Sequence, residues 1–135
     1  MWDKYQKTLN SEASFSGIGL HSGKEIDVTL IPSNSNSGIT FKRTDLVGNN
    51  EIIANFKNVS SAKLCTKIEN DFGASVSTIE HLMAAFYICG IDNVIVNLNG
   101  SEVPIMDGSA KDFVKIIKNV GTKTLKSKRK FIKIK

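Results

Sequence analysis

The sequence predicts an α+β fold, a two-layer domain in which a mixed or antiparallel β-sheet carries two α-helices packed on one face. Apolar and polar residues alternate in short segments through much of the chain, which is the pattern of half-buried strands. Two segments of the second half change to the helical spacing i, i+3, i+4, i+7. The order of several strands, helix, strand and helix is typical of helices gathered on one face of a sheet.

The expected strands lie mainly in the first two thirds of the chain. The clearest contains Ile26, Val28 and Leu30, which alternate with polar or charged residues. Glycine, asparagine, serine or proline residues interrupt the chain between most of these segments. The segments with strand character are residues 9–18, 26–30, 39–41, 51–56, 63–68 and 94–98.

Two amphipathic helices follow from the change of period. The apolar positions and the C-terminal stop of the first are Ile79, Leu82, Met83, Phe86 and Gly90, and those of the second are Phe113, Ile116, Ile117, Val120 and Gly121. Ser77 with Glu80 three residues later predicts a capping box at the first helix. Ser109 is the expected N-cap of the second helix.

The length of 135 residues suits one domain with its own core. The last segment, residues 128–135, has strand character although the sequence stops there. We therefore expect residues 1–127 to be the first domain of a two-domain protein. Residues 128–135 would begin a strand or linker that leads to a second domain absent from this sequence.

The composition excludes several classes of protein. With 41% hydrophobic and 23% charged residues, the chain is unlike a disordered or low-complexity protein. Its longest apolar run, residues 82–91, is about half of what a membrane span needs, and residues 1–10 are too polar for a signal peptide. Cys65 and Cys89 form no disulfide framework and no Cys-x-x-Cys metal site. We expect a cytoplasmic protein without a transmembrane segment.

The net charge of +5 is a property of the C-terminal tail. Residues 123–135 hold seven basic side chains and no acidic one, which leaves 11 basic against 13 acidic residues elsewhere. A nucleic-acid footprint should instead spread over a folded face and interleave aromatic residues. We therefore expect no nucleic-acid partner, and interpret the tail as a solvated basic segment.

The pair Glu80 and His81 at the start of the first helix admits two interpretations. In the structural one, Glu80 completes the capping box and His81 is a packing or surface residue. In the functional one, a carboxylate acts as general base beside an imidazole that binds a metal. Because the His-Glu-x-x-His spacing is missing, this helix could supply only one ligand of a zinc site.

Five ordered blocks bear on this choice. They are Gly17-Ile18-Gly19-Leu20-His21-Ser22-Gly23, Leu64-Cys65-Thr66, Ser77-Thr78-Ile79-Glu80-His81-Leu82-Met83-Ala84-Ala85, Gly90-Ile91-Asp92-Asn93 and Glu102-Val103-Pro104-Ile105-Met106-Asp107-Gly108-Ser109-Ala110. Together they resemble the N-terminal domain of the UDP-3-O-acyl-N-acetylglucosamine deacetylases, zinc amidases of lipid A biosynthesis in Gram-negative bacteria. The resemblance runs from about Thr8 to the last residue.

The resemblance implies roles for particular residues. Glu80 matches the family's general base, and His81 matches the one zinc ligand that the first domain supplies. The other Zn²⁺ ligands of the family come from its second domain. The implied reaction is zinc-dependent hydrolysis of the N-acetyl group of UDP-3-O-acyl-N-acetylglucosamine, with this chain supplying half of the active site. We accordingly expect the isolated chain to be inactive and to bind zinc weakly.

Substrate contacts are also implied. Leu64, Cys65 and Thr66 match a segment that lines the cleft of the family, and His21 matches a glycine-flanked loop close to it. Lys63 stands where some relatives have an apolar residue.

Other interpretations stay open at this point. The chain could be a non-catalytic fragment or binding module, or its tail could bind nucleic acid. A self-contained zinc site of His21, His81 and a carboxylate such as Asp107 is a further alternative, although the resemblance assigns only His81 to the metal.

Overall fold

The computed structural model describes residues 4–61 and 65–130. These residues form two α-helices, ten strands and one short 3-10 helix. In chain order the elements are β1 (Tyr5–Leu9), β2 (Ala13–Ile18), β3 (Glu25–Pro32), β4 (Ile39–Arg43), β5 (Glu51–Ile53), η1 (Phe56–Asn58), β6 (Val59–Ser61), β7 (Lys67–Glu69), β8 (Ser75–Ser77), α1 (Glu80–Cys89), β9 (Val94–Leu98), α2 (Lys111–Val120) and β10 (Thr122–Lys128).

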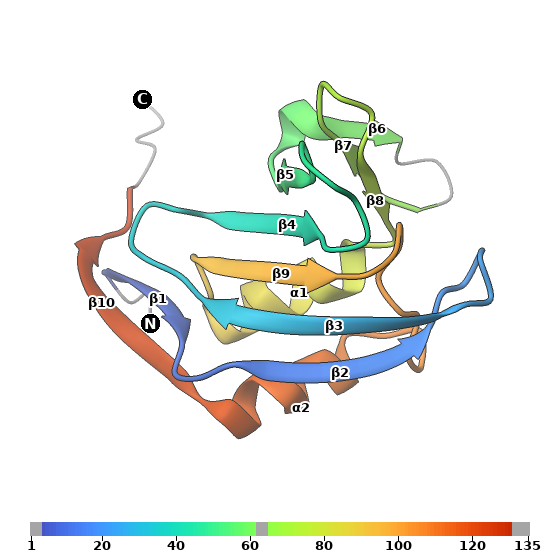
Figure 1. Cartoon of the computed structure of the whole chain (residues 1–135). Coiled ribbons are helices and arrows are strands. Elements are labelled where there is room, and N and C mark those ends of the chain that lie inside the picture. The colour runs from blue at the N-terminus through green and yellow to red at the C-terminus, as the bar shows by residue number, and fades with distance from the viewer. Residues whose placement is uncertain (1–3, 62–64, 131–135) are drawn as a thin grey trace.

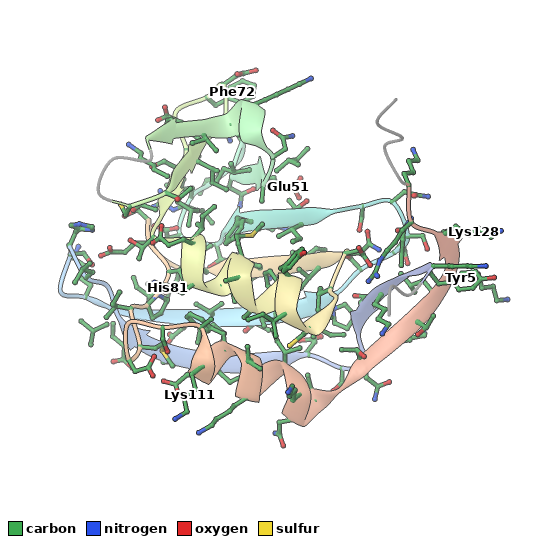
Figure 2. All side chains as sticks on the ribbon, turned by 180° about the vertical axis from the view of Figure 1, so that it is seen from behind. Tyr5, Glu51, Phe72, His81, Lys111 and Lys128 are labelled. Atoms are coloured by element: carbon green, nitrogen blue, oxygen red, sulfur yellow. The ribbon has the colours of Figure 1, made fainter. Side chains whose placement is uncertain are left out.

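The main layer is a five-stranded sheet with the strand order β2-β3-β9-β4-β5. β4 runs parallel to β9, and the other neighbouring pairs of this sheet are antiparallel. Both helices lie behind this sheet in Figure 1 and in front of it in the reverse view of Figure 2. The predicted two-layer α+β fold, with a mixed sheet and both helices on one face, is therefore confirmed.

Alternation along the central strands decides which side chains meet the helices. In β3, Ile26, Val28 and Leu30 are at most 4% exposed, while their neighbours point to the other face. The helices and β9 fill the same core with Leu82, Ala85, Phe86, Val94, Val96, Leu98, Phe113 and Ile117. Burying a large apolar side chain contributes about 1.5–3 kcal/mol, so this core is the main source of stability.

The C-terminal ends of both helices lie at the predicted glycines, whereas the N-terminal ends differ from the prediction. Gly90 ends α1 in the left-handed conformation, with φ 72°, and its amide donates to the carbonyls of the preceding turn. Gly121 ends α2. The N-cap position of α2 is Ala110 rather than Ser109, although the Ser109 hydroxyl still accepts the Lys111 amide at 3.2 Å. No helix within residues 4–61 and 65–130 has the length and apolar character needed to cross a membrane.

Several strands differ from the prediction in their bounds. The expected strand at residues 9–18 is divided between β1 and β2, and the one at 51–56 is shortened to β5 before η1. Of residues 63–68 only the end belongs to β7, and residues 63 and 64 lie outside the described part of the chain. β8 was not expected, because three residues are too few to show a period. It is held by antiparallel pairing with β7.

The C-terminal strand begins earlier than the sequence suggests. β10 covers Thr122–Lys128 and pairs with β1 in antiparallel register, with Leu9 opposite Thr122 and Tyr5 opposite Lys128. Arg129 follows, and its guanidinium bonds the Asp92 carboxylate and the Gly90 carbonyl. The strand expected over residues 128–135 falls mostly on residues outside the described range. The proposed boundary at residue 127 stays a prediction.

Candidate active site

A pocket of about 270 Å³ opens where the first turn of α1 meets the segments before β7 and after β2. It is lined by Leu20, Cys65, Thr66, Thr78, Glu80, His81 and Ile105. The structure thus brings Glu80, His81, Cys65 and Thr66 together, as expected. Leu64 lies outside the described residues, and His21 is not among the lining residues, although its neighbour Leu20 is.

Glu80 is bound across the pocket rather than to its own helix. Its Oε2 accepts a hydrogen bond from the Thr66 amide at 2.6 Å. The Ile79 amide donates to the Thr66 carbonyl at 3.4 Å, so the two walls meet at a second point. No described residue bonds the second carboxylate oxygen, Oε1. One oxygen of the carboxylate is therefore held by the opposite wall of the pocket.

The predicted capping box is wrong. Ser77 is the last residue of β8, and both its amide and its hydroxyl donate to the Ser101 carbonyl, at 2.9 and 3.3 Å. The N-cap position of α1 is Ile79, with no side-chain cap. Because the carboxylate of Glu80 bonds the opposite wall instead, helix capping does not account for this residue.

Thr78 makes the turn from β8 into α1 in an unfavourable backbone conformation. Its φ is 61°, which is rare for a β-branched residue, and its side chain is 3% exposed. The Thr78 hydroxyl has no hydrogen-bond partner among the described residues. Strain of this kind is typically stored at functional sites. The left-handed turn at Thr78 sets the direction in which α1 begins, and therefore the direction in which Glu80 and His81 leave the backbone.

His81 is half-buried and lines the open pocket, so it is not sealed in the core. Figure 2 shows it in the first turn of α1, at the end of the helix nearest the β2–β3 connection. No group of three or more histidine, cysteine, aspartate or glutamate side chains suited to a metal occurs in the described chain. The alternative site of His21, His81 and Asp107 is therefore not formed.

Asp107 has a different role. Its Oδ1 accepts the amide and the hydroxyl of Ser109, at 3.0 and 2.8 Å, in a turn that leads into α2. These hydrogen bonds lower the pKa of Asp107 below its ordinary value of 3.8. The carboxylate thus stabilises a surface turn.

His21 lies against the carboxylate of Glu102, a residue for which the sequence pattern predicted no role. Its Nδ1 is 3.2 Å from Oε2 of Glu102, a residue that is 2% exposed. Burial alone would raise the pKa of Glu102, but hydrogen bonds from Ser22 and His21 bring it below its ordinary value of 4.5. An acidic residue within the apolar-rich segment 102–106 was the available signal for this contact.

Comparison with known proteins gives a consistent result. The family model of UDP-3-O-acyl N-acetylglycosamine deacetylase matches residues 6–135. Proteins named UDP-3-O-acyl-N-acetylglucosamine deacetylase from Geotalea uraniireducens and Citrifermentans bemidjiense are 53% and 51% identical over 131 residues, and one from Blochmanniella pennsylvanica is 44% identical over 130 residues.

These matches cover 96–97% of the chain but only 42–44% of each relative. The chain spans less than half the length of the curated relatives it matches. The match extends through all five sequence blocks and through the elements that form the pocket. The chain therefore belongs to the UDP-3-O-acyl N-acetylglycosamine deacetylase family.

Proposed function

We propose that this chain supplies the general base and one zinc ligand of a deacetylase site that the remainder of a family-length protein completes. The reaction is hydrolysis of the N-acetyl group of UDP-3-O-acyl-N-acetylglucosamine, the compound in the names of the relatives. It would serve lipid A biosynthesis in the cytoplasm of a Gram-negative bacterium. The observation that carries the proposal is that Glu80 and His81 open into one pocket.

Glu80 has the features of a general base. Its Oε2 is held by the Thr66 amide, which fixes the direction of the carboxylate. In the proposed reaction Glu80 removes a proton from water as the water oxygen bonds to the acetyl carbon. The carbon–nitrogen bond then breaks as the departing nitrogen takes up the proton that was removed from water. The products are acetate and the free 2-amino sugar nucleotide.

The donor set fits zinc in part. His81 offers an imidazole at the pocket, but a catalytic zinc needs about three protein ligands. Since the described residues contain no such group, the other ligands would come from the rest of a family-length protein. When bound, zinc supplies Lewis-acid polarisation of the acetamide carbonyl and of the attacking water. The isolated chain should be inactive.

The outer face of α1 supports a shared site. Ala84, Tyr87 and Ile88 follow Glu80 on one side of the helix, and the last two are 80% and 62% exposed. Figure 2 shows both helices on the near side, with no described element in front of them. We propose that the remainder of a family-length protein covers this apolar face, because such a surface is costly to leave in water.

Substrate contacts are proposed on the same basis. Cys65 and Thr66 line the pocket, and Leu64 precedes them in the sequence. His21 stands beside Leu20, the residue of the β2–β3 connection that reaches the pocket. These four residues would contact the sugar nucleotide or its acyl chain at the walls around Glu80.

Complementation tests the proposal. The chain would be mixed with the C-terminal part of the Geotalea uraniireducens relative and zinc, and acetate release from UDP-3-O-acyl-N-acetylglucosamine would be measured. Activity should need both parts and zinc, and Glu80→Ala should abolish it. Glu12→Ala, which changes an exposed carboxylate near the start of the sequence, should leave the activity intact. A stable but inactive complex would favour the alternative, a non-catalytic binding module.

A further inference from the structure

Glu102 is an unusual residue in this fold because its carboxylate is buried without a lysine or arginine partner among the described residues. Such a group is costly to bury unless hydrogen bonds replace its water. Here the donors come from one turn. Oε1 accepts the Ser22 amide at 2.7 Å, and the His21 amide lies 3.1 and 3.2 Å from the two oxygens. The His21 ring adds a contact at 3.2 Å.

The β2–β3 connection is shaped around this carboxylate. A side chain at Gly19 would overlap Oε1 of Glu102, so the backbone can approach only as glycine. Two hydrogen bonds close the loop, from the Gly23 amide to the Gly19 carbonyl at 3.0 Å and from the Gly19 amide to the Lys24 carbonyl at 2.9 Å. The loop of residues 19–24 therefore has the carboxylate as its internal anchor.

The backbone around Glu102 is tied to the other wall of the pocket. The Ser77 amide donates to the Ser101 carbonyl at 2.9 Å, and the Val103 amide donates to the Ser77 carbonyl at 3.0 Å. Ser77 immediately precedes the turn that carries Glu80 and His81. Two residues beyond Val103, the Ile105 amide donates to the Ile18 carbonyl at 3.1 Å. Residues 101–105 thus join the β8–α1 turn to the β2–β3 connection.

We propose that Glu102 is a positioning residue of the candidate site, whose buried carboxylate fixes the loop of residues 19–24 so that Leu20 forms one wall of the pocket. Leu20 is 56% exposed, so packing alone does not hold it there. Its position follows from the bonds of the next two residues to Glu102. The inference takes the pocket of Glu80 and His81 as the active site, and in this respect it depends on the proposed function.

The thiol of Cys65, in the same pocket, provides a probe that needs neither zinc nor substrate. In a Cys89→Ser background it is the single cysteine of the chain, and its rate of alkylation by iodoacetamide would be measured. Glu102→Gln removes the charge and one acceptor oxygen, so the loop should loosen and the rate should rise about tenfold. Glu12→Gln, at an exposed carboxylate, is the matched control and should leave the rate unchanged.

Amide hydrogen exchange tests the anchor directly in the unmodified chain. The amides of His21 and Ser22 should be protected although both residues are exposed, because they point at a buried carboxylate. Exchange at both should become about tenfold faster in Glu102→Gln, while the Thr66 amide, bound to Glu80, should not change. If Glu102→Gln does not fold, Gly19→Ala displaces the carboxylate from the other side and should give the same acceleration.

Two results would overturn the proposal. One is free exchange of the His21 and Ser22 amides in the unmodified chain. The other is a folded Glu102→Gln or Gly19→Ala variant in which both Cys65 reactivity and loop exchange are unchanged. Both measurements are independent of catalysis. A chain that fails to support deacetylation can still show the anchored loop, which would contradict only the proposed function. An active chain whose loop is not anchored by Glu102 would contradict only this inference.

Discussion

The carboxylate of Glu80 accepts a hydrogen bond from the backbone amide of Thr66, 2.6 Å away on the opposite wall of the pocket. Glu80 lies in the first turn of α1, and Thr66 lies in the segment before β7. The bond makes the orientation of the carboxylate depend on two parts of the chain. Because the bond needs only an acceptor oxygen, a substitution that keeps this oxygen can separate the structural contribution of Glu80 from its chemical contribution.

Glu80→Gln is expected to separate these contributions. Glutamine keeps an oxygen that can accept the Thr66 amide, but it cannot take a proton from water. In the complemented enzyme, the rate of acetate release should fall by about 10²–10⁴-fold, while the urea midpoint of the isolated chain changes little. Retention of more than a tenth of the activity would show that another group is the base.

We expect the isolated chain to bind zinc weakly, and we expect His81→Ala to abolish this binding. Calorimetric titration with zinc would measure it, and addition of the C-terminal part of a relative should strengthen binding in the unmodified chain. His21→Ala serves as the control, because His21 faces Glu102 and lies outside the pocket lining. Zinc binding that depends on His21 as strongly as on His81 would contradict the assignment of the ligand.

Truncation of two adjacent residues of α1, Phe86 and Tyr87, should change the free energy of unfolding by very different amounts. Phe86 is fully buried, so Phe86→Ala should lower the free energy of unfolding by about 3–5 kcal/mol. Tyr87 is 80% exposed, so Tyr87→Ala should change it by less than about 0.5 kcal/mol. Tyr87→Ala should nevertheless weaken association with the C-terminal part of a relative. Unchanged association would indicate that this face is not the contact surface.

Acid should destabilise the chain partly through Glu102. The pKa of Glu102 in the folded chain lies below its ordinary value of 4.5, so the unfolded chain binds the proton first as the pH falls. The stabilisation is complete above about pH 4.5 and is lost as the pH falls through the lower, folded value. Urea unfolding between pH 7 and 3 should show a smaller loss of stability in Glu102→Gln than in the unmodified chain. Parallel pH profiles would exclude this contribution.

Arg129 should stabilise the end of the described chain through its bonds to Asp92 and Gly90. The Arg129 side chain is 14% exposed, its Nε is 3.0 Å from Oδ2 of Asp92, and a further nitrogen donates to the Gly90 carbonyl at 2.8 Å. Arg129→Ala should therefore cost about 1–3 kcal/mol in urea unfolding. Arg129→Lys should restore only part of this, because lysine lacks the planar set of donors. Lys126→Ala, at an exposed position of β10, should have almost no effect.

The sequence predicted the elements whose period is set by packing. Leu82 and Phe86 repeat at helical spacing because one side of α1 meets the sheet, and Val94, Val96 and Leu98 alternate because one side of β9 meets the helices. Gly90 was recognised as a helix end because its left-handed backbone is unfavourable for other residues. The family resemblance, confirmed by the comparisons, named four of the residues that line the pocket, which are Cys65, Thr66, Glu80 and His81.

What the sequence missed depends on distant partners. Ser77 and Glu80 have the spacing of a capping box, yet each bonds a residue of another segment. β8 and β10 are short or polar and exist because β7 and β1 pair with them. Glu102 is an acidic residue among apolar neighbours, but its partner His21 is 81 residues away in the sequence, and the two meet only in the folded chain.

The pairing of β1 with β10 has a consequence for how the polypeptide acquires its fold. Tyr5 and Leu9 find their backbone partners at Lys128 and Thr122, almost at the other end of the described residues. A ribosome releases the first strand long before its partner exists, so the unpaired edge must wait until nearly the whole segment has been synthesised. Contacts this distant in sequence form slowly. Closure of this two-stranded ribbon is therefore expected to be among the last events on the folding pathway.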